Sequence, residues 1–162
     1  RGCGPSTTTG GPADARIGQR YGAPMVTIDD VAALAHAFPG VTEGTRWGHR
    51  TWQVGRSGFA WVRPFSKADL KRFGDAPVPS GGIVALRVDD LGEKEAVLPA
   101  GRPGFFDIAH FAGYPAVLVQ LSKVRARDLR EAMEDAWLAC APPAVAETWL
   151  AGSRRRSRRL ED

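Results

Sequence analysis

Apolar residues recur at helical spacing in two parts of the chain. Residues 28–38 carry one apolar stripe, with Thr27 and Asp30 at capping-box spacing before it and a Pro-Gly pair after it, which predicts a helix over this range. A longer stripe between Arg127 and Cys140 repeats at i, i+3, i+4, i+7, i+8 and i+11. It predicts a second helix that packs against the core.

The pattern continues beyond that second helix. Two prolines break it, and the second of them, Pro143, can open a final helix that runs through Trp149 and ends at Gly152. The outer face of the 127–140 helix carries a mixed, slightly acidic set of side chains. We therefore exclude this helix as a reader of a DNA groove, because carboxylates repel phosphates.

Alternating and short apolar runs predict strands between the outer helices. The expected strands cover residues 43–47, 51–54, 59–63, 83–88, 105–108 and 116–121, with short helices at 67–73 and 90–98. Residues 55–58 have the composition of a hairpin turn, and the continuous apolar run 83–88 indicates a central strand. The order predicts an α+β fold: an antiparallel sheet of about five or six short strands with N-terminal and C-terminal helices packed on it.

Length and composition suit a single domain. The chain has 162 residues, of which 43% are hydrophobic and 25% charged, enough for one hydrophobic core. Residues 1–24 are rich in Gly, Pro and Thr and are predicted to be a disordered leader, with Met25 as the biological start. Residues 25–152 are predicted to form the folded domain, and residues 153–162 a basic disordered tail.

The lack of targeting signals in the sequence and the arrangement of its cysteines predict a cytoplasmic protein. No apolar run is long enough to span a membrane, and the start lacks the apolar segment of a signal peptide. Cys3 and Cys140 form neither a C-x-x-C pair nor a disulfide framework, which suits a reducing compartment.

The formal net charge of +4 belongs to the two ends of the chain. Residues 1–24 carry a net charge of +2 and residues 153–162 a net charge of +3. Residues 25–152 hold 14 basic and 15 acidic side chains, a net charge of −1. Any attraction of the folded domain to phosphates must therefore come from a local patch.

Several segments carry a family resemblance. They are FPGVTEG at 38–44, WGH at 47–49, GFAW at 58–61, KE at 94–95 and GYPAVLV at 113–119. With these segments the chain resembles the MmcQ/YjbR family over roughly residues 26–151. The resemblance implies a CyaY-like (frataxin-like) α+β fold and DNA binding through a so-called double-wing arrangement. It brings no catalytic signature.

Exposed basic side chains on the hairpin, the following helix and the tail are the candidate DNA contacts. Only Asp69 and Asp75 interrupt the basic stretch from Arg46 to Asp75, and a cation at a turn tip can reach a phosphate. The alternative is a solvated basic surface that serves solubility. The candidates are Arg50, Arg56, Arg63, Lys67, Lys71, Arg72, Arg154, Arg155 and Arg156.

A pocket is the alternative site. Trp47, His49, His110 and Tyr114 lie in turns between predicted strands and could form a pocket for a small ligand or a protein partner. The two histidines could also converge with Asp107 on a metal or small ligand, but no metal-ligand spacing supports this, so no metal and no cofactor is expected. The five tryptophans are interpreted mainly as core residues.

Two further features bear on function. Phe59, Trp61 and Arg63 share one face of their predicted strand, which leaves open a stacking platform for single-stranded bases. The chain has no nucleophile elbow, P-loop or dinucleotide fingerprint. The sequence thus predicts a non-catalytic protein that binds DNA, or alternatively a small-ligand or protein-interaction module that uses the aromatic and histidine pocket.

Overall fold

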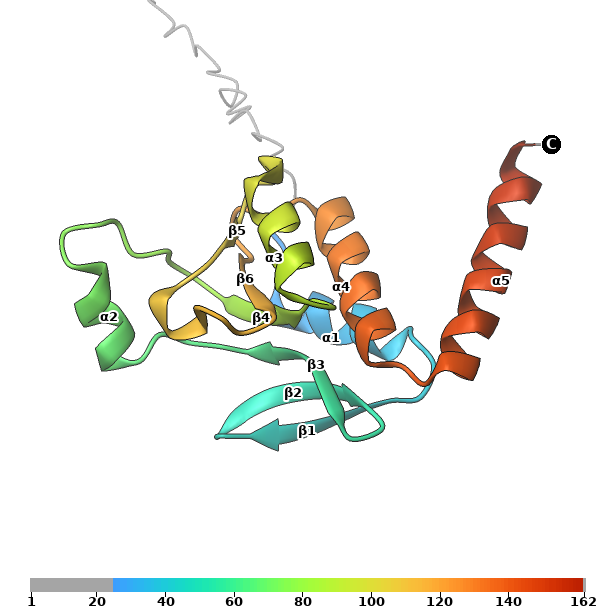
Figure 1. Ribbon diagram of the computed structural model, residues 1–162, viewed down its shortest axis with the longest axis horizontal. Helices are drawn as coiled ribbons and strands as arrows, with labels where there is room; N and C mark the ends of the chain where they lie inside the picture. The colour runs from blue at the N-terminus through green and yellow to red at the C-terminus, as the bar shows by residue number, and fades with distance from the viewer. Residues whose placement is uncertain (1–24, 162) are drawn as a thin grey trace, which may run out of the picture.

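The computed structural model describes residues 25–161 and confirms the predicted α+β class (Figure 1). The expectation of a disordered leader over residues 1–24 lies outside the described residues. The described elements are α1 (Ile28–His36), β1 (Val41–Arg46), β2 (His49–Val54), β3 (Ser57–Val62), α2 (Lys67–Phe73), β4 (Ile83–Arg87), α3 (Leu91–Val97), η1 (Leu98–Ala100), β5 (Phe105–Phe106), η2 (Ala109–Phe111), β6 (Ala116–Gln120), α4 (Ala126–Cys140) and α5 (Pro143–Glu161).

The strands form one antiparallel sheet in the order β1-β2-β3-β4-β6-β5. β4 lies between β3 and β6, and its continuous apolar sequence correctly predicts this central position. The strand predicted at 105–108 is shorter and forms only the two-residue edge strand β5. Gly104 leads into it with a φ of +88°, and a Cβ there would lie 2.8 Å from the backbone nitrogen of Val124, so only glycine permits this close approach.

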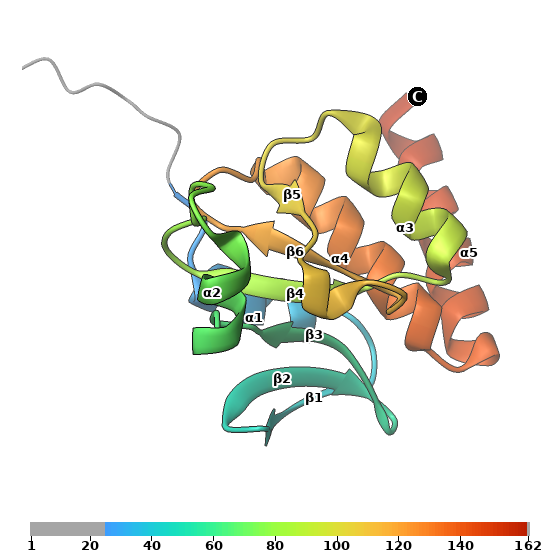
Figure 2. The same cartoon turned by 60° about the vertical axis from the view of Figure 1, so that its left-hand side comes forward.

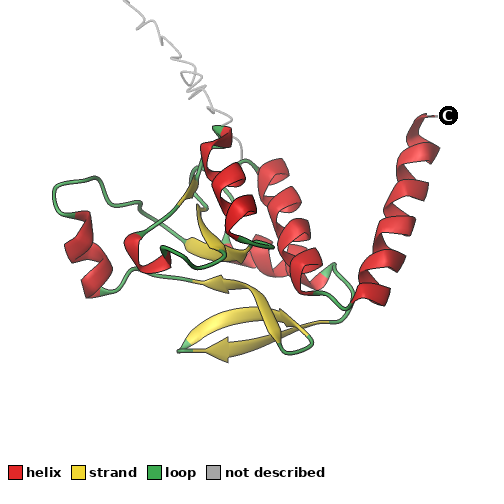
Figure 3. Ribbon diagram, viewed as in Figure 1, coloured by secondary structure: helices red, strands yellow, loops and turns green. Residues whose placement is uncertain are grey.

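The two faces of the sheet are covered differently. α1 and α4 cover one face, where Trp52, Leu86 and Trp137 belong to the larger buried cluster. On the other face a smaller cluster around Trp61 and Leu118 is covered by η2 and by side chains from the segments beside it. Figure 3 shows the β1–β2 hairpin at the lower edge of the molecule, with the helices gathered above it.

A β-bulge separates two aromatic residues of β3. The pairing of β2 with β3 shifts register after Trp52, where Phe59 has no partner across the strands. Phe59 therefore turns toward the helix-covered cluster, whereas Trp61 packs on the opposite face. The expectation that Phe59, Trp61 and Arg63 share one face is therefore wrong. The stacking platform for bases depended on this shared face, so it is not supported either.

Both predicted capping boxes are present. Thr27 and Asp30 cap α1, and hydrogen bonds from the backbone and hydroxyl of Thr27 lower the pKa of Asp30. Ser66 and Asp69 cap α2 in the same way. The two short polar motifs therefore predict the start of each helix correctly.

The final helix is longer than its sequence suggests. The expected end at Gly152 and the expected disorder beyond it are wrong, because α5 continues to Glu161. Arginine has a high helix propensity, and a single interior glycine costs only about 1 kcal/mol. The guanidinium of Arg156 lies 5.3 Å over the ring of Trp149 and donates to Ser153 Oγ at 3.0 Å, which ties the extension to the first half of the helix.

α5 also stands apart from the sheet. Figures 1 and 2 show its C-terminal end pointing away from the rest of the domain. Its first half is anchored by Trp149, whose indole N–H donates to Glu134 on α4 at 2.7 Å. Within residues 25–161, no helix combines the length and the apolar character that a membrane crossing requires.

Candidate functional site: an aromatic pocket at the first hairpin turn

An open pocket of about 650 Å³ lies where the β1–β2 turn, the end of β3 and the η2 segment meet. All four side chains predicted for a pocket line it: Trp47, His49, His110 and Tyr114. The structure adds six that sequence reasoning did not assign to it, Trp61, Arg63, Pro64, Phe65, Ser66 and Phe111. Five of them come from the segment 61–66 and the sixth from η2, and only the aromatic residues among them offered a sequence signal.

Trp47 is unusual in both its backbone and its exposure. It forms the two-residue β1–β2 turn with Gly48, and both residues have a positive φ, 51° and 79°. Such a turn favours Asn, Asp or Gly, and a left-handed conformation costs other residues roughly 1–2 kcal/mol. Within residues 25–161 Trp47 is the sole non-glycine residue with a positive φ, and it is 82% exposed. Strained residues of this kind cluster at functional sites, which makes Trp47 a candidate functional residue.

The floor of the pocket is a fixed set of aromatic rings. Trp61 and Phe111 are 8% and 5% exposed, and their ring centroids lie 6.3 Å apart. Tyr114 contacts both rings in edge-on geometry, at 6.5 Å from Trp61 and 5.7 Å from Phe111. Edge-to-face packing of this kind orients aromatic side chains. The pocket is therefore preformed along its floor.

Arg63 forms a polar part of the wall. Its guanidinium lies 5.5 Å over the ring of Phe111 and donates to the carbonyl oxygen of Pro64 and, at 2.9 Å, to Asp69 Oδ2. Asp69 is almost fully buried. Burial alone would raise the pKa of Asp69, but hydrogen bonds from Ser66 and Arg63 outweigh it and lower that pKa. Arg63 is thus held in place by an ionised carboxylate behind it.

Buried Lys94 on α3 fixes the segment that carries His110 and Tyr114. Its Nζ donates to the carbonyl oxygens of Phe111 at 2.6 Å and Tyr114 at 3.0 Å, and lies 3.1 Å from Asp107 Oδ1. A lysine 5% exposed needs such partners, because an unpaired buried charge is very costly. Sequence reasoning assigned Lys94 no role at the site. The available signal was a lysine within a short predicted helix, which could have indicated a buried polar contact.

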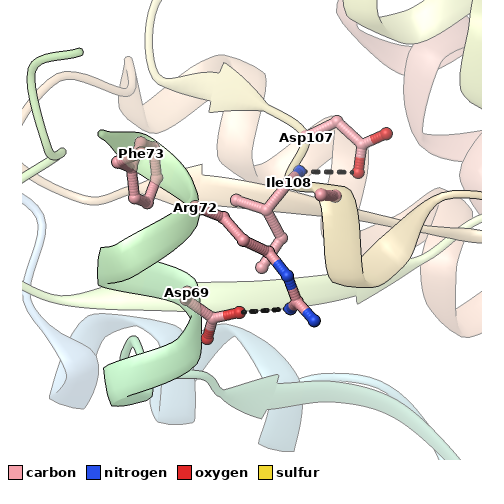
Figure 4. Close-up of a pocket in the computed structure, with 6 residues that line it drawn as sticks. Asp69, Arg72, Phe73, Asp107 and Ile108 are labelled. Carbon is pink, nitrogen blue, oxygen red and sulfur yellow. Dashed lines mark hydrogen bonds and ion pairs between the residues drawn. The ribbon is translucent and has the colours of Figure 1, made fainter. Parts of the chain in front are cut away.

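A smaller hollow of about 150 Å³ lies between α2 and η2 (Figure 4). Figure 4 shows Asp69 and Arg72 on α2 opposite Ile108, with the carboxylate of Asp107 turned away from α2. Arg72 lies 3.8 Å from Asp69, and Asp107 accepts a hydrogen bond from the backbone N–H of Ile108 at 2.9 Å. These contacts support the pocket from behind, and neither carboxylate lines the aromatic pocket itself.

The hypothesis of a metal held by His49, His110 and Asp107 is not supported, because Asp107 does not line the pocket. His49 and His110 both line the pocket, but Asp107 does not and is paired with Lys94. In the part of the chain that the structure describes, no three His, Cys, Asp or Glu side chains are grouped so that they could hold a metal ion.

Several of the predicted DNA contacts are engaged in ion pairs. Arg50 donates to Glu43 at 2.6 Å and to Asp29 at 3.4 Å, and lies 5.4 Å over the ring of Trp52. The hydrogen bond from Arg50, supported by bonds from His36 and Trp52, lowers the pKa of Glu43 from 4.5 to about 2 against the effect of burial. Arg50 therefore belongs to an ion-pair network.

The remaining candidates do not form one surface. Among the described residues, Arg56, Lys67 and Lys71 take part in no ion pair. Arg56 lies at the β2–β3 turn, whereas the two lysines lie on α2, beyond the opposite end of β3 (Figure 1). A six-residue strand is about 20 Å long, so these cations lie far apart. Residues 154–156 lie on α5, on another part of the molecule.

Sheet, helices and pocket together define a small α+β domain with one preformed aromatic cavity. The family model described as YjbR matches residues 36–139, which include every residue that lines the pocket. Uncharacterized proteins of Mycobacterium tuberculosis and Mycobacterium bovis are 44% identical over 133 residues, which cover 80% of this chain and 99% of theirs. The chain belongs to the YjbR family, as its sequence segments predict. The family match ends before α5 begins.

Proposed function

We propose that this protein is a non-catalytic binding domain that takes a planar small molecule into the aromatic pocket. The observation that carries the proposal is Trp47, an exposed indole in a strained turn that lines the pocket. A planar ligand would stack on this indole, and each aromatic pair of this kind contributes about 0.5–1.5 kcal/mol beyond area burial.

Size and lining support a small-molecule site. A volume of about 650 Å³ lies within the usual range of ligand pockets, which combine apolar walls with a few placed polar groups. Here the walls are aromatic, and the polar groups come from His49, Arg63, Ser66, His110 and the Tyr114 hydroxyl.

The polar groups favour binding over catalysis. One serine, Ser66, lines the pocket. Its hydroxyl donates to Asp69 at 2.9 Å as part of the helix cap. A serine nucleophile needs a base that accepts its proton in position for attack, and a capping carboxylate does not provide that arrangement. The two histidines therefore serve as hydrogen-bonding groups in the proposed site.

A fluorescent titration with the neutral probe phenylnaphthylamine tests this function. We expect saturable binding to the full chain and a loss of about tenfold or more in affinity for Trp47→Asn, because asparagine suits the turn but offers no ring. Leu160→Asn is the matched control, since Leu160 is 89% exposed on α5, and it should leave the affinity unchanged. Unaltered binding by Trp47→Asn, or no saturable binding at all, would overturn the proposal.

DNA contact, the function that the sequence predicted first, is a second candidate, and α5 is the observation that favours it. Arg154, Arg155, Arg158 and Arg159 lie within an arc of roughly 140° of the helix, at 100° per residue. All four are exposed and stand outside the family match. An exposed row of arginines can neutralise several phosphates without reading bases.

Salt-titrated binding to duplex and single-stranded DNA tests this candidate on the full chain. Replacing the four arginines by glutamine should flatten the log–log salt dependence on duplex DNA by about 0.9 for each phosphate that the variant no longer neutralises. The matched variant replaces Arg56, Lys67 and Lys71 by glutamine and should bind like the original protein. If this second variant alone loses binding, the DNA interface lies on the hairpin and α2 instead. No binding at low salt rejects DNA as the partner.

A further inference from the structure

We infer that the ligand of the aromatic pocket is an aromatic anion, a planar ring system with a carboxylate, sulfonate or phosphate group, and that His49, His110 and Arg63 receive this group. The inference rests on the proposed function and specifies the class of its ligand. The inference is argued from the charged groups around the pocket. Trp47 and the aromatic floor, which support the proposed function, do not determine the charge of the ligand.

The lining contains donors and no acid. His49, Arg63 and His110 are its ionisable groups apart from the Tyr114 phenol, and none of the ten lining residues is Asp or Glu. Aromatic faces also attract cations, but the guanidinium of Arg63 already lies 5.5 Å over the ring of Phe111, and its fixed charge repels a second cation. The lining therefore selects against cationic ligands.

The nearest carboxylates are occupied by protein groups. Asp69 accepts from the guanidinium of Arg63 and from the backbone and hydroxyl of Ser66, all at 2.9 Å. Asp107 is held by Lys94 and by a backbone N–H. Because both are fixed away from the lining, they do not repel a ligand anion at close range.

Cations outnumber carboxylates in the shell around the pocket. The carboxylates are Asp69 and Asp107, as described above. The cations that contact them or the pocket's aromatic side chains are Arg63, Arg72, Arg87 and Lys94. Arg87 donates to the Tyr114 hydroxyl at 3.2 Å and lies 5.7 Å from that ring. These four cations and two carboxylates together carry two excess positive charges, and such an excess attracts an anion.

Arg63 retains donors for a ligand. A guanidinium has five N–H groups, and the described contacts of Arg63 use two of them, one to Pro64 and one to Asp69. Each neutral imidazole offers one further N–H. Charge-assisted hydrogen bonds from these groups are shorter and about twice as strong as neutral ones, so an anionic group gains more here than a neutral polar group.

Two probes with one ring skeleton test the inference. Anilinonaphthalenesulfonate carries a sulfonate, and phenylnaphthylamine is its uncharged counterpart. We expect the full chain to bind the anion about tenfold more tightly. His49→Gln together with His110→Gln should remove most of this preference, measured as the ratio of the two probe affinities in the same variant.

The controls separate the two proposals. Binding of the neutral probe that depends on Trp47, with no preference for the anion or with a preference that survives the histidine double variant, overturns this inference alone. Failure of both probes to bind overturns the proposed function. Sulfonates also pair with exposed arginines, so the titration is repeated with the four-arginine α5 variant. If the preference disappears in that variant, the anion binds on α5 and the inference is contradicted.

Discussion

The two faces of the sheet use the same combination of side chains in different settings. On the face covered by α1 and α4, Arg50 binds Glu43 and lies over the ring of Trp52. Trp52 is fully buried there, and two helices seal the face. In this setting the ring belongs to the core, and the arginine and the carboxylate form an ion-pair network at the edge of the core.

On the other face, Arg63 binds Asp69 and lies over the ring of Phe111. Here the cover is the short η2 turn and side chains beside it, and a pocket remains open next to the arginine. The same three groups thus become part of a binding wall when no long helix covers them. The amount of cover, rather than the type of residue, separates the structural face from the candidate functional face.

The largest expected effect lies on the helix-covered face. Trp137→Ala should lower the free energy of unfolding by about 3–5 kcal/mol, because it removes a fully buried ring. It also removes the donor to the Pro39 carbonyl oxygen. Chemical denaturation measures this loss, and Trp137→Phe should recover part of it. A loss below about 1 kcal/mol would contradict the view that this face is the stability core.

Lys94→Met should have an intermediate effect on stability and should also weaken binding in the pocket. Removing the ammonium takes one of two donors from each of the two carbonyl oxygens and from Asp107, which keep their backbone N–H partners, for a loss of about 2 kcal/mol in unfolding free energy. The segment with His110 and Tyr114 loses its anchor, so probe affinity should also fall. The neighbouring exposed Glu95→Met is the control and should change neither quantity. Unchanged probe affinity in Lys94→Met would argue against its positioning role.

Acid should weaken the ion-pair network around Glu43. The folded-state pKa of Glu43 is about 2, below its ordinary value of 4.5, so its contribution to stability is present above pH 4.5 and is lost as the pH falls toward 2. Solvent screening limits this contribution to about 1 kcal/mol. Unfolding free energies of the original protein and Glu43→Gln should differ near neutral pH and converge near pH 2. A constant difference over this range would assign the effect to packing.

Trp47→Asn should have the smallest effect on stability, and in the opposite direction. Asparagine tolerates the positive φ of this turn, so we expect a gain of up to about 1 kcal/mol in unfolding free energy. The same change should abolish most probe binding. Trp47 would then lower stability and support binding, whereas Trp137 supports stability. A loss of stability in Trp47→Asn would contradict this contrast.

Local sequence patterns predicted the elements well. The capping boxes at Thr27 and Ser66 mark true helix starts, and the apolar run 83–88 marks the central strand. The pocket residues Trp47 and His110 were also predicted, because turns at strand ends bring such side chains together at the edge of a sheet. The helix starts and the strand rest on interactions within a few residues of chain, whereas the pocket prediction rests on where strand ends meet in a sheet.

Contacts that depend on how the chain folds back on itself escaped prediction. Lys94 meets carbonyl oxygens 17 and 20 residues away, and Arg63 was assigned to DNA because its partner Asp69 is recognisable only once α2 folds back. The bulge at Phe59 changes which face a side chain occupies, which alternation along one strand does not reveal. α5 extends beyond Gly152 partly through the contact of Arg156 with Trp149.

The sequence by itself determined the α+β class, the family and the helix starts, because caps, periodicity and turn composition act over one or two turns of chain. Tertiary structure alone decided which cations are paired, which face is left open, and that the predicted pocket has no acid in its lining. The physical reason is that burial and ion pairing depend on segments far apart in the chain. Their position relative to one another exists only after the sheet has formed.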